Sequence, residues 1–379
     1  MEKIRTAVIG CGKVGGTHTL VYQTLPNTEL SAVCDLDPDR AKAFAETYKA
    51  PFYTDAGKMI RENGIQVVSI CTPHPLHADA ICAAAEAGAH VICEKPLGSS
   101  LLDCDLAIQA CEKAGVKLGV ISQRRFYWPV VRMVEAIRAG KIGRPIIGVM
   151  QVMGWRSPEY YLMDPWRGKW KEEGGGVMVN QTPHQLDLLQ WIMGDIEELF
   201  GYWDNFNHSS IEVEDTAVAI LRFKSGAIGN IFVSNSQKPG LWGKVHIHGE
   251  NGASVGTQVE GGSSFISGVT AKAEPAFNDI WTIPGEESLL ETWKAEDARN
   301  TELHDPMTYF HQLQIADFVD AVIQNRKPAV DGYDGRKTVE LFTAVYRSQR
   351  DRLPVRFPLE PEDRDDFDGR LSYRPFSRR

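Results

Sequence analysis

The sequence lacks several features that would decide its class at once. It has no apolar run approaching the ~18 residues that span a bilayer, no internal repeat and no low-complexity block. Its N-terminus enters an apolar strand pattern without the features of a signal peptide. Basic residues are in the minority, with 41 Lys and Arg against 50 Asp and Glu, so the net charge is −9. This balance argues against nucleic acid or a membrane as partner, and we expect a soluble, cytoplasmic protein.

Cysteine is sparse and confined to the first third of the chain. The sequence has 7 cysteines, and none forms a Cys-x-x-Cys pair. Cys11, Cys34, Cys71 and Cys93 lie in or just after apolar runs. An odd number of cysteines at such positions predicts buried, reduced thiols and not disulfides or a zinc site. We therefore expect no metal.

The first third alternates between strand-like and helical patterns. Apolar, β-rich runs occupy residues 4–10, 29–35, 65–72, 89–93 and 116–121. Helical patterns occupy residues 38–48, 75–87 and 100–114. This alternation predicts an α/β domain of the Rossmann type, with a doubly wound parallel sheet, over residues 1–123.

The pattern changes beyond a linking helix at residues 127–139. An amphipathic helix is expected at 181–193, and strand-like runs occupy residues 146–155, 198–204, 216–223, 227–234 and 243–248. Strands joined by short turns predict a mostly antiparallel, open sheet in an α+β domain over residues 124–358. Helical patterns at 308–324 and 334–349 are expected to pack back near the first domain. Residues 359–379 mix both charges with few apolar side chains and are interpreted as an arm or a disordered end.

A glycine cluster, GCGKVG, directly follows the first strand. Gly10, Gly12 and Gly15 fit the G-x-G-x-x-G pattern that brings a backbone close to a pyrophosphate at a helix N-terminus. Asp35 ends the second strand, where a carboxylate can bind the adenosine ribose. The alternative is a plain turn. Asp35 favours NAD over NADP, although Arg40 could offset that preference. Further cofactor contacts are expected from the two residues within the cluster, Lys13 and Val14.

Two later stretches, CTPHPLHADAICAAAEAGAHVICEKPLG (71–98) and GGGVMVNQTPHQLDLL (174–189), make the assignment specific. With the glycine cluster and the closing DGYDGRKTVELFTAVYRSQRDRLPVRFP (331–358), they resemble the Gfo/Idh/MocA family, the glucose–fructose oxidoreductase and inositol dehydrogenase group, over residues 3–357. The resemblance implies an NAD-dependent oxidoreductase. It would transfer a hydride between nicotinamide and a ring secondary alcohol of a sugar or sugar derivative. It also implies a homodimer or homotetramer that forms through the C-terminal sheet.

Lys95 follows the fourth strand at the carboxyl edge of the predicted parallel sheet, where such sheets bind ligands. A partly desolvated ammonium there can donate to a substrate oxygen and assist proton transfer. A structural pairing with Glu94 or with a cofactor phosphate is the alternative.

Asn180 and His184 are four residues apart at the start of the expected helix, so we place them on one face. Family members commonly have Asp and His at these positions, beside the lysine, to handle the hydroxyl proton. Asn180 can bind a hydroxyl but cannot take a proton. The proton relay is therefore assigned to His184 with Lys95. The Asn-Gln-x-x-His form resembles the branch that acts on nucleotide-linked sugars, such as N-acetylglucosaminuronate 3-dehydrogenases.

The segment GWRSPEYYLMDPWRGKWKEEGGG (154–176) is unusually rich in aromatic residues and arginine. Such side chains suit the C–H faces and hydroxyl edges of sugars, although a buried aromatic hairpin has the same composition. The resemblance places Trp166 and Arg167 at the cofactor and suggests Arg124, Arg156 and Tyr161 for the substrate. It also places further residues along the cofactor: Thr72, Pro73, His77, Glu94, Lys95 and Gln123.

Three other functions share these residues. They are a 3-dehydrogenase of simple glycosides or of C-glycosides, an inositol or cyclitol dehydrogenase, and a non-catalytic regulator that senses NAD. The presence of both Lys95 and His184 argues against the regulator. His246 and His248 are two apart on a strand and are interpreted as sheet-face residues, since no third metal ligand is evident.

Overall fold

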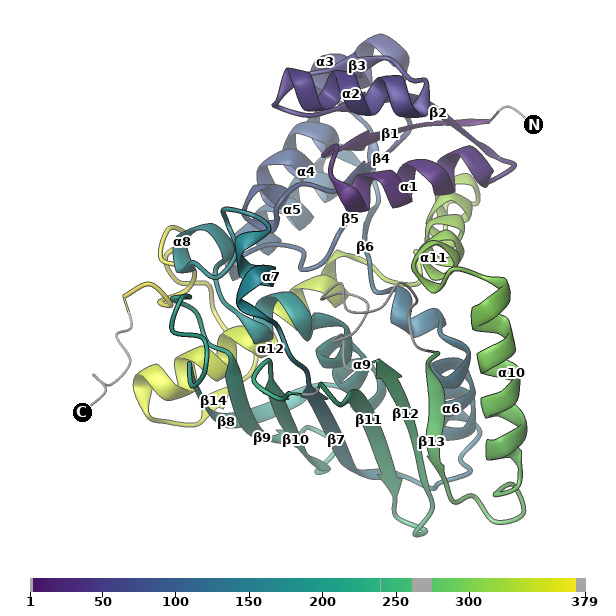
Figure 1. The fold of residues 1–379 in the computed structure, drawn as a ribbon, viewed down its shortest axis with the longest axis vertical. Coiled ribbons are helices and arrows are strands. Elements are labelled where there is room, and N and C mark those ends of the chain that lie inside the picture. The colour runs from purple at the N-terminus through teal and green to yellow at the C-terminus, as the bar shows by residue number, and fades with distance from the viewer. Residues whose placement is uncertain (1–2, 239, 261–274, 373–379) are drawn as a thin grey trace. The chain divides into compact units, whose positions relative to one another are not determined.

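The described part of this computed structural model comprises residues 3–238, 240–260 and 275–372. The chain divides into two compact units (Figure 1). The first unit comprises residues 1–123 and 307–336, and the second comprises residues 124–306 and 337–379. The chain therefore leaves the first unit, returns to it for one stretch and leaves it again.

A parallel sheet of six strands forms the centre of the first unit, in the order β3-β2-β1-β4-β5-β6. Its strands are β1 (Ile4–Ile9), β2 (Thr28–Cys34), β3 (Phe52–Tyr53), β4 (Val67–Ile70), β5 (His90–Cys93) and β6 (Leu118–Val120). The order reverses between β1 and β4, which is where sheets of this type bind ligands. The predicted doubly wound fold is confirmed.

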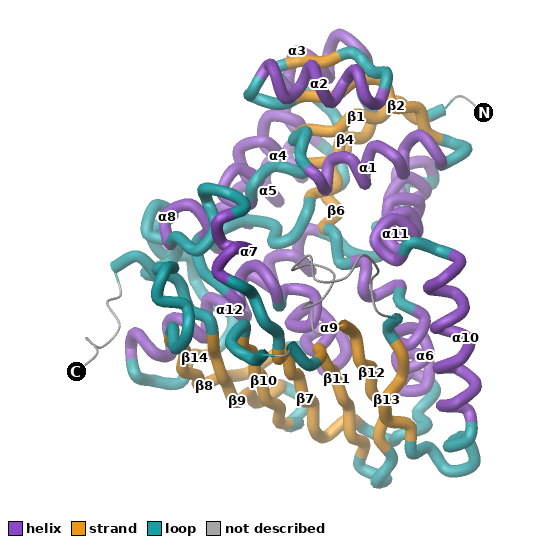
Figure 2. Tube along the Cα trace, in the orientation of Figure 1, coloured by secondary structure: helices purple, strands orange, loops and turns teal. Residues whose placement is uncertain are grey.

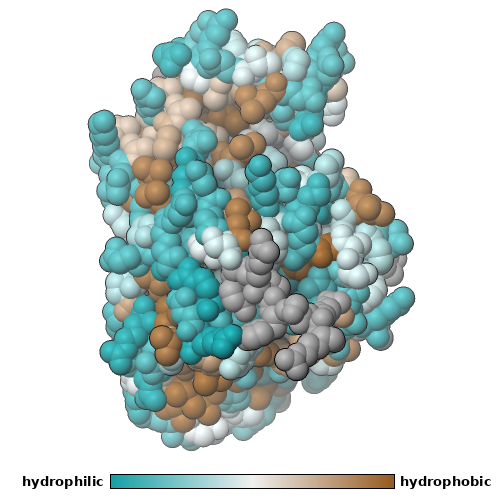
Figure 3. Space-filling view, turned by 90° about the vertical axis from the view of Figure 1, so that its left-hand side faces the viewer, coloured by the Kyte–Doolittle hydropathy of each residue, from teal (hydrophilic) through white to brown (hydrophobic). Residues whose placement is uncertain are grey.

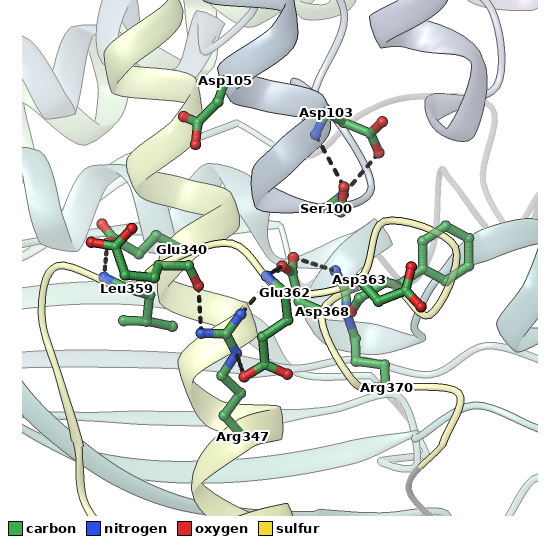
Figure 4. Close-up of polar contacts among 12 residues, drawn as sticks. Ser100, Asp103, Asp105, Glu340, Arg347, Leu359, Glu362, Asp363, Asp368 and Arg370 are labelled. Carbon is green, nitrogen blue, oxygen red and sulfur yellow. Dashed lines mark hydrogen bonds and ion pairs between the residues drawn. The ribbon is translucent and has the colours of Figure 1, made fainter.

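The helices of the first unit are α1 (Lys13–Thr24), α2 (Pro38–Tyr48), α3 (Ala56–Asn63), α4 (His77–Glu86), α5 (Leu101–Ala114) and α11 (Pro306–Ile323), with a short 3-10 turn η1 (His74–Leu76). Three of them, α2, α3 and α5, begin at side-chain caps that the sequence provides. Asp37 accepts hydrogen bonds from the first amides of α2. Ser100 and Asp103 form a reciprocal capping box at the start of α5 (Figure 4). The pair β3 and α3 was not predicted.

Helix α11 returns to the first unit and completes its core. Ile315, Phe318 and Val319 are buried in one cluster with Val8 of β1 and Ile92 of β5. A buried side chain of this size contributes about 1.5–3 kcal/mol on leaving water. The parallel sheet is therefore stabilised by a helix far from it in the sequence.

The second unit is built on an eight-stranded sheet in the order β13-β12-β11-β7-β10-β9-β8-β14. Its strands are β7 (Pro145–Met153), β8 (Ile196–Asp204), β9 (Thr216–Phe223), β10 (Ile228–Ser234), β11 (Trp242–Gly249), β12 (Ser254–Glu260), β13 (Phe277–Trp281) and β14 (Val355–Arg356). All its neighbours run antiparallel except β7 and β10, which are parallel. The predicted antiparallel sheet is confirmed.

Helices α6 and α9 cover one face of this sheet (Figure 2). The helical elements of this unit are α6 (Trp128–Arg138), α7 (Pro158–Leu162), α8 (Trp170–Glu173), a π-helical turn η3 (Val177–Gln181), α9 (Pro183–Met193) and α10 (Leu289–Leu303). Helix α12 (Gly332–Asp351) carries the chain from the first unit into the second at the last of the three boundaries, and the 3-10 turn η2 (Gln123–Phe126) spans the first.

The opposite face of the sheet carries exposed apolar side chains along β8, β9 and β10. Along β8, β9 and β10 buried and exposed residues alternate, as the period of a strand requires. The exposed set includes Tyr202, Val218, Ile220 and Phe232, and Ile220 is 67% exposed. Figure 3 shows that apolar side chains also gather at the lower end of that view. Contiguous apolar surface of this kind is typical of protein–protein contacts.

The segment after β14 is held to α12 by its charges (Figure 4). The amide of Leu359 donates to Glu340, and Arg347 pairs with Glu362 and with Asp368. Arg370 is fully buried and donates to the carbonyl oxygen of Gly174. Of the two predicted alternatives, an arm or a disordered end, residues 359–372 form an ordered arm, because their charges pair with α12 and with one another. Residues 373–379 lie outside the described residues.

All seven cysteines are free thiols, and five of them are buried. Burial raises the pKa of Cys11 and of Cys34 to about 12, which disfavours the thiolate form of both. Cys11, Cys34 and Cys93 are buried as predicted, whereas Cys71 and Cys82 are only half-buried. Among the described residues, no helix is both long and apolar enough to cross a membrane.

Candidate active site

The glycine cluster forms the turn between β1 and α1, and the absence of a side chain matters for a different reason at each glycine. Gly10 has φ +102°, and a Cβ there would lie 2.5 Å from the backbone of Cys71. A Cβ at Gly15 would lie 2.1 Å from the carbonyl oxygen of Gly10. At Gly12 a Cβ would meet nothing within 4 Å, so the bare backbone there faces open space.

Helix α1 begins at this turn without a side-chain cap and with no acidic residue in its first turn. Its first amides therefore form a site for an anion. Lys13 and the exposed Val14 lie in that first turn. This cradle fits the pyrophosphate of a dinucleotide.

Asp35 lies at the end of β2, next to the glycine turn. Its Oδ2 accepts from the amide of Cys11 at 2.9 Å, and its Oδ1 accepts from the amide of Asp37 at 3.0 Å. The guanidinium of Arg40 lies 3.7 Å from the same carboxylate. The two amides fix the orientation of the carboxylate, and its contact with the adenosine ribose stays a prediction.

Two buried polar atoms at the carboxyl edge of the sheet have no hydrogen-bond partner among the described residues. They are Oγ1 of Thr72, after β4, and Oε1 of Gln123, after β6. Buried polar atoms are rarely left unpaired, so these two fit contacts to a bound molecule. The neighbouring Pro73 is exposed at the same edge.

His77 has a different environment from the other predicted cofactor contacts. Its Nδ1 lies 2.8 Å from the carbonyl oxygen of Pro96, and its Nε2 lies 2.9 Å from that of Thr72. Burial lowers the pKa of His77, while the two carbonyl groups oppose that shift. The imidazole thus ties the turn after β4 to the turn after β5. A direct contact with the cofactor stays a prediction.

Glu94 and Lys95 follow β5, and a buried cluster holds them in place. Oε1 of Glu94 lies 3.1 Å from Nε2 of His18 on α1 and 3.4 Å from Nε2 of His311 on α11. Oε2 accepts from the amide of Lys95 at 3.2 Å. Although burial opposes it, the two histidines hold the pKa of Glu94 well below its usual range. Burial lowers the pKa of His18.

This cluster was not predicted from the sequence. Its three ligand-type atoms lie within 4.8 Å of one another, but hydrogen bonds already account for their arrangement. His18 also bonds Ser69 at 2.8 Å, and His311 donates to the carbonyl oxygen of Met307. The cluster fixes the backbone from which the half-buried Lys95 projects.

In the second unit, a glycine-rich turn leads into η3. Glu214 is fully buried and accepts from the amides of Gly176 and Met178, at 2.8 and 3.0 Å. A Cβ at Gly176 would lie 1.9 Å from the backbone of Glu214, so only glycine fits there. Burial raises the pKa of Glu214 to about 7. Arg370 contacts the same turn through Gly174.

Asn180 lies in the π-helical turn and not on α9, which begins at Pro183. Proline starts helices well because it needs no amide partner, and α9 therefore begins anew after the turn. The prediction that Asn180 and His184 share one α-helical face is wrong for this reason. π-helical turns recur at functional sites. His184 lies in the first turn of α9 and is buried.

Asp187 is one turn further along α9 and has a structural partner. Its carboxylate accepts from Nε and Nη2 of Arg125, at 2.8 and 2.5 Å. The guanidinium of Arg125 also stacks over the Trp191 ring at 4.7 Å. Arg124 is buried, and its Nε and Nη1 have no hydrogen-bond partner among the described residues.

The aromatic segment forms α7, a turn and α8, so it is not a hairpin. Arg167 donates to Tyr160, and Gln181 bonds both Tyr160 and Asn235, which in turn donates to Tyr161. Arg167 also lies 4.4 Å above the Trp166 ring, and Arg156 lies 5.2 Å above that of Tyr160. The predicted Arg156, Tyr161, Trp166 and Arg167 thus lie in one network with the turn that carries Asn180.

His246 and His248 lie on the face of β11 as predicted. His246 bonds Asp279 at 2.9 Å, and His248 bonds Ser254 at 2.8 Å. Lys244 pairs with the same Asp279. Both imidazoles therefore bond to residues of other strands in the same sheet.

Comparison with known proteins agrees with this geometry. Residues 4–122 match the model of the oxidoreductase family with an NAD-binding Rossmann fold, and residues 130–255 match that of the GFO/IDH/MocA C-terminal domain. Myo-inositol 2-dehydrogenase of Thermotoga maritima is 27% identical over 358 residues, which cover 93% of this chain and 98% of that protein.

Two solved structures are similar over nearly the whole chain. The WlbA dehydrogenase of Bordetella pertussis, in complex with NADH and UDP-GlcNAcA, has a TM-score of 0.82 and 30% identity and covers 95% of this chain and 99% of its own. The WlbA dehydrogenase of Chromobacterium violaceum, with the same ligands, has a TM-score of 0.81 and 29% identity and covers 95% and 97%. The chain therefore belongs to the GFO/IDH/MocA oxidoreductase family and is an NAD-dependent oxidoreductase.

Proposed function

We propose that this enzyme oxidises a ring secondary alcohol of a nucleotide-linked sugar, with a UDP-linked N-acetylated hexuronic acid as the best candidate. The proposal rests on the whole-chain similarity to the two WlbA dehydrogenases, whose structures hold UDP-GlcNAcA. The Asn180-Gln181-x-x-His184 pattern supports the same branch. The arginines around α7 and α8 suit a carboxylate or a diphosphate on the substrate.

Each predicted residue has one task in this reaction. When NAD⁺ is bound, it supplies the hydride acceptor, which is C4 of its nicotinamide. His184 takes the hydroxyl proton, and Lys95 donates a hydrogen bond to the same substrate oxygen. Asn180 binds a substrate hydroxyl without exchanging a proton, because an amide has no titratable group near neutral pH. The roles of Arg124, Arg156 and Tyr161 in binding the substrate stay predictions.

An inositol or another cyclitol is the second candidate. The similarity to myo-inositol 2-dehydrogenase extends over 93% of this chain and favours it. A cyclitol offers the same ring hydroxyls but lacks the negative charge that the arginines would bind.

We also propose that two copies pair through the exposed face of β8, β9 and β10. Tyr202 and Ile220 are 59% and 67% exposed there, and this apolar face would leave water on pairing. The free thiols support a reducing compartment such as the cytoplasm.

The experiment that tests the function is a rise in absorbance at the reduced-nicotinamide band. Purified enzyme with added NAD⁺ is offered UDP-linked N-acetylhexuronic acid, UDP-N-acetylglucosamine, free sugars, simple glycosides and inositols. A rise with the acidic nucleotide sugar alone supports the proposal. A rise with inositols alone favours the cyclitol reading, and none with any member despite NAD binding contradicts both.

A further inference from the structure

Glu173, the last residue of α8, has an unusual position for a carboxylate. It is 2% exposed, and it lies beside Asn180. One carboxylate oxygen accepts from Nδ2 of Asn180, and the other accepts from the amide of Gly168 at 2.5 Å. The contact joins α8 to η3, across the glycine turn.

A carboxylate can only accept hydrogen bonds, whereas an amide has one donor end and one acceptor end. The donor end of Asn180 is engaged by Glu173. Reversal of the amide would place Oδ1 against the carboxylate, so that two acceptors would face each other in a buried site. The amide orientation is therefore fixed by Glu173.

We propose that Glu173 is a positioning residue that makes Asn180 present Oδ1, as a hydrogen-bond acceptor, to a substrate hydroxyl or amide proton. This inference rests on the proposed function of Asn180 as a substrate contact. It specifies the substrate chemistry further, because the group that Asn180 binds must be a donor. A ring carbon with O–H or N–H next to the reacting alcohol meets this requirement, whereas a deoxy or O-methylated carbon does not.

The surroundings of Glu173 make this orientation depend on pH. Burial raises its pKa to about 7, while the Gly168 amide, Asn180 and the Arg167 charge oppose that shift and Glu214 adds to it. Among the described residues, Tyr161 is also close enough to interact electrostatically with Glu173. Above this pKa the carboxylate holds the amide as described. Below it the carboxylic acid can donate to Oδ1 and reverse the amide.

The first test replaces Glu173 by Gln, which keeps the shape but can donate as well as accept. We expect KM for the sugar to rise about tenfold at pH 8, roughly the contribution of one hydrogen bond, with kcat changed little. In the wild type, KM should rise as the pH falls through 7, and in Glu173→Gln that dependence should be lost. Glu172→Gln, at an exposed neighbouring position, is the matched control and should match the wild type.

The second test separates positioning from packing. Asn180→Asp alone brings two carboxylates together and should raise KM more than Glu173→Gln does. The double variant Glu173→Gln/Asn180→Asp restores a donor–acceptor pair and should recover part of the loss. A double variant that is as impaired as the sum of the two single changes contradicts the proposal.

A third readout does not need turnover, so it separates this inference from the proposed function. The side-chain amide signal of Asn180 in ¹⁵N-labelled protein, assigned by its absence in Asn180→Asp, should titrate near pH 7. It should not titrate in Glu173→Gln. An amide signal that is independent of pH in the wild type, or a Glu173→Gln enzyme with unchanged KM and pH profile, overturns the role of Glu173. Absence of turnover with every sugar would instead contradict the proposed function.

Discussion

Two of the three glycines in the turn after β1, Gly12 and Gly15, predict different effects for the same substitution. Gly12 has φ −90° and ψ −170°, an extended conformation that alanine also adopts. A methyl group there would meet nothing within 4 Å. At Gly15 the same methyl group would lie 2.1 Å from the carbonyl oxygen of Gly10. One substitution therefore probes the cofactor, and the other probes the fold.

We expect Gly12→Ala to unfold with nearly wild-type free energy. The smaller entropy of its unfolded chain offsets the poorer capping of α1 by alanine, and each effect is about 0.5–1 kcal/mol. Binding of NAD should weaken because the methyl group occupies the approach of the pyrophosphate. Loss of one or two hydrogen bonds to charged oxygens corresponds to about 2–3 kcal/mol, or roughly 30- to 150-fold in Kd.

For Gly15→Ala the free energy of unfolding should fall by about 1–3 kcal/mol or more, because a backbone atom must move. NADH fluorescence titration gives Kd for both variants, and urea unfolding without cofactor gives the stability. A Gly12→Ala protein that binds NADH with wild-type affinity refutes the placement of the pyrophosphate. A Gly12→Ala protein that loses as much stability as Gly15→Ala refutes the distinction between the two positions.

Four further changes test other parts of the molecule. Lys95→Ala should abolish hydride transfer and leave NADH affinity largely intact; full activity would contradict its catalytic role. Asp35→Ala should raise the Kd for NAD with little change in thermal stability, and an unchanged Kd would contradict the ribose contact. Ile220→Asp should shift the sedimentation coefficient toward that of a single chain, whereas an unaltered assembly would exclude this face. Asp215→Asn should lower stability by roughly 3 kcal/mol at neutral pH, because it breaks the buried pair with His208. Burial alone would raise the pKa of Asp215, but hydrogen bonds from His208 and from backbone amides lower it. Burial alone would lower the pKa of His208, but the Asp215 carboxylate raises it. The stabilisation from this ion pair should therefore be present above the ordinary carboxyl pKa and be lost in acid, where Asp215 becomes protonated. It should also decline as the pH rises through the raised pKa of His208. Denaturant titrations at a series of pH values measure this dependence.

Strands and helices with a clear period could be predicted from the sequence. Buried and exposed residues alternate along β8, β9 and β10 because only one face of that sheet is covered. The strands of the parallel sheet are mostly apolar because both of its faces are buried. The missed elements have weak patterns. Gly256 interrupts β12, where it leaves room for the His246 ring. Helix α10 has only one buried residue, Asp297, so it lacks an apolar stripe.

The residues of the candidate site could be predicted, but their partners could not. Lys95 and His184 stand in recognisable motifs. Glu94, by contrast, is held by His18 and His311, which come from distant segments whose packing no local pattern specifies. The contact between Glu173 and Asn180 depends on a π-helical turn, and an α-helical spacing rule cannot predict it.

The return of α11 to the first unit has a consequence for synthesis of the protein. When residues 1–123 leave the ribosome, the helix that covers Val8 and Ile92 has not yet been translated. The nascent nucleotide-binding half must therefore wait, with an uncovered apolar surface, until the residues of the second unit up to 306 have been made. The same connection means that a gene fragment ending at residue 123 encodes an incomplete domain, so exchange of cofactor-binding halves between relatives requires two crossover points.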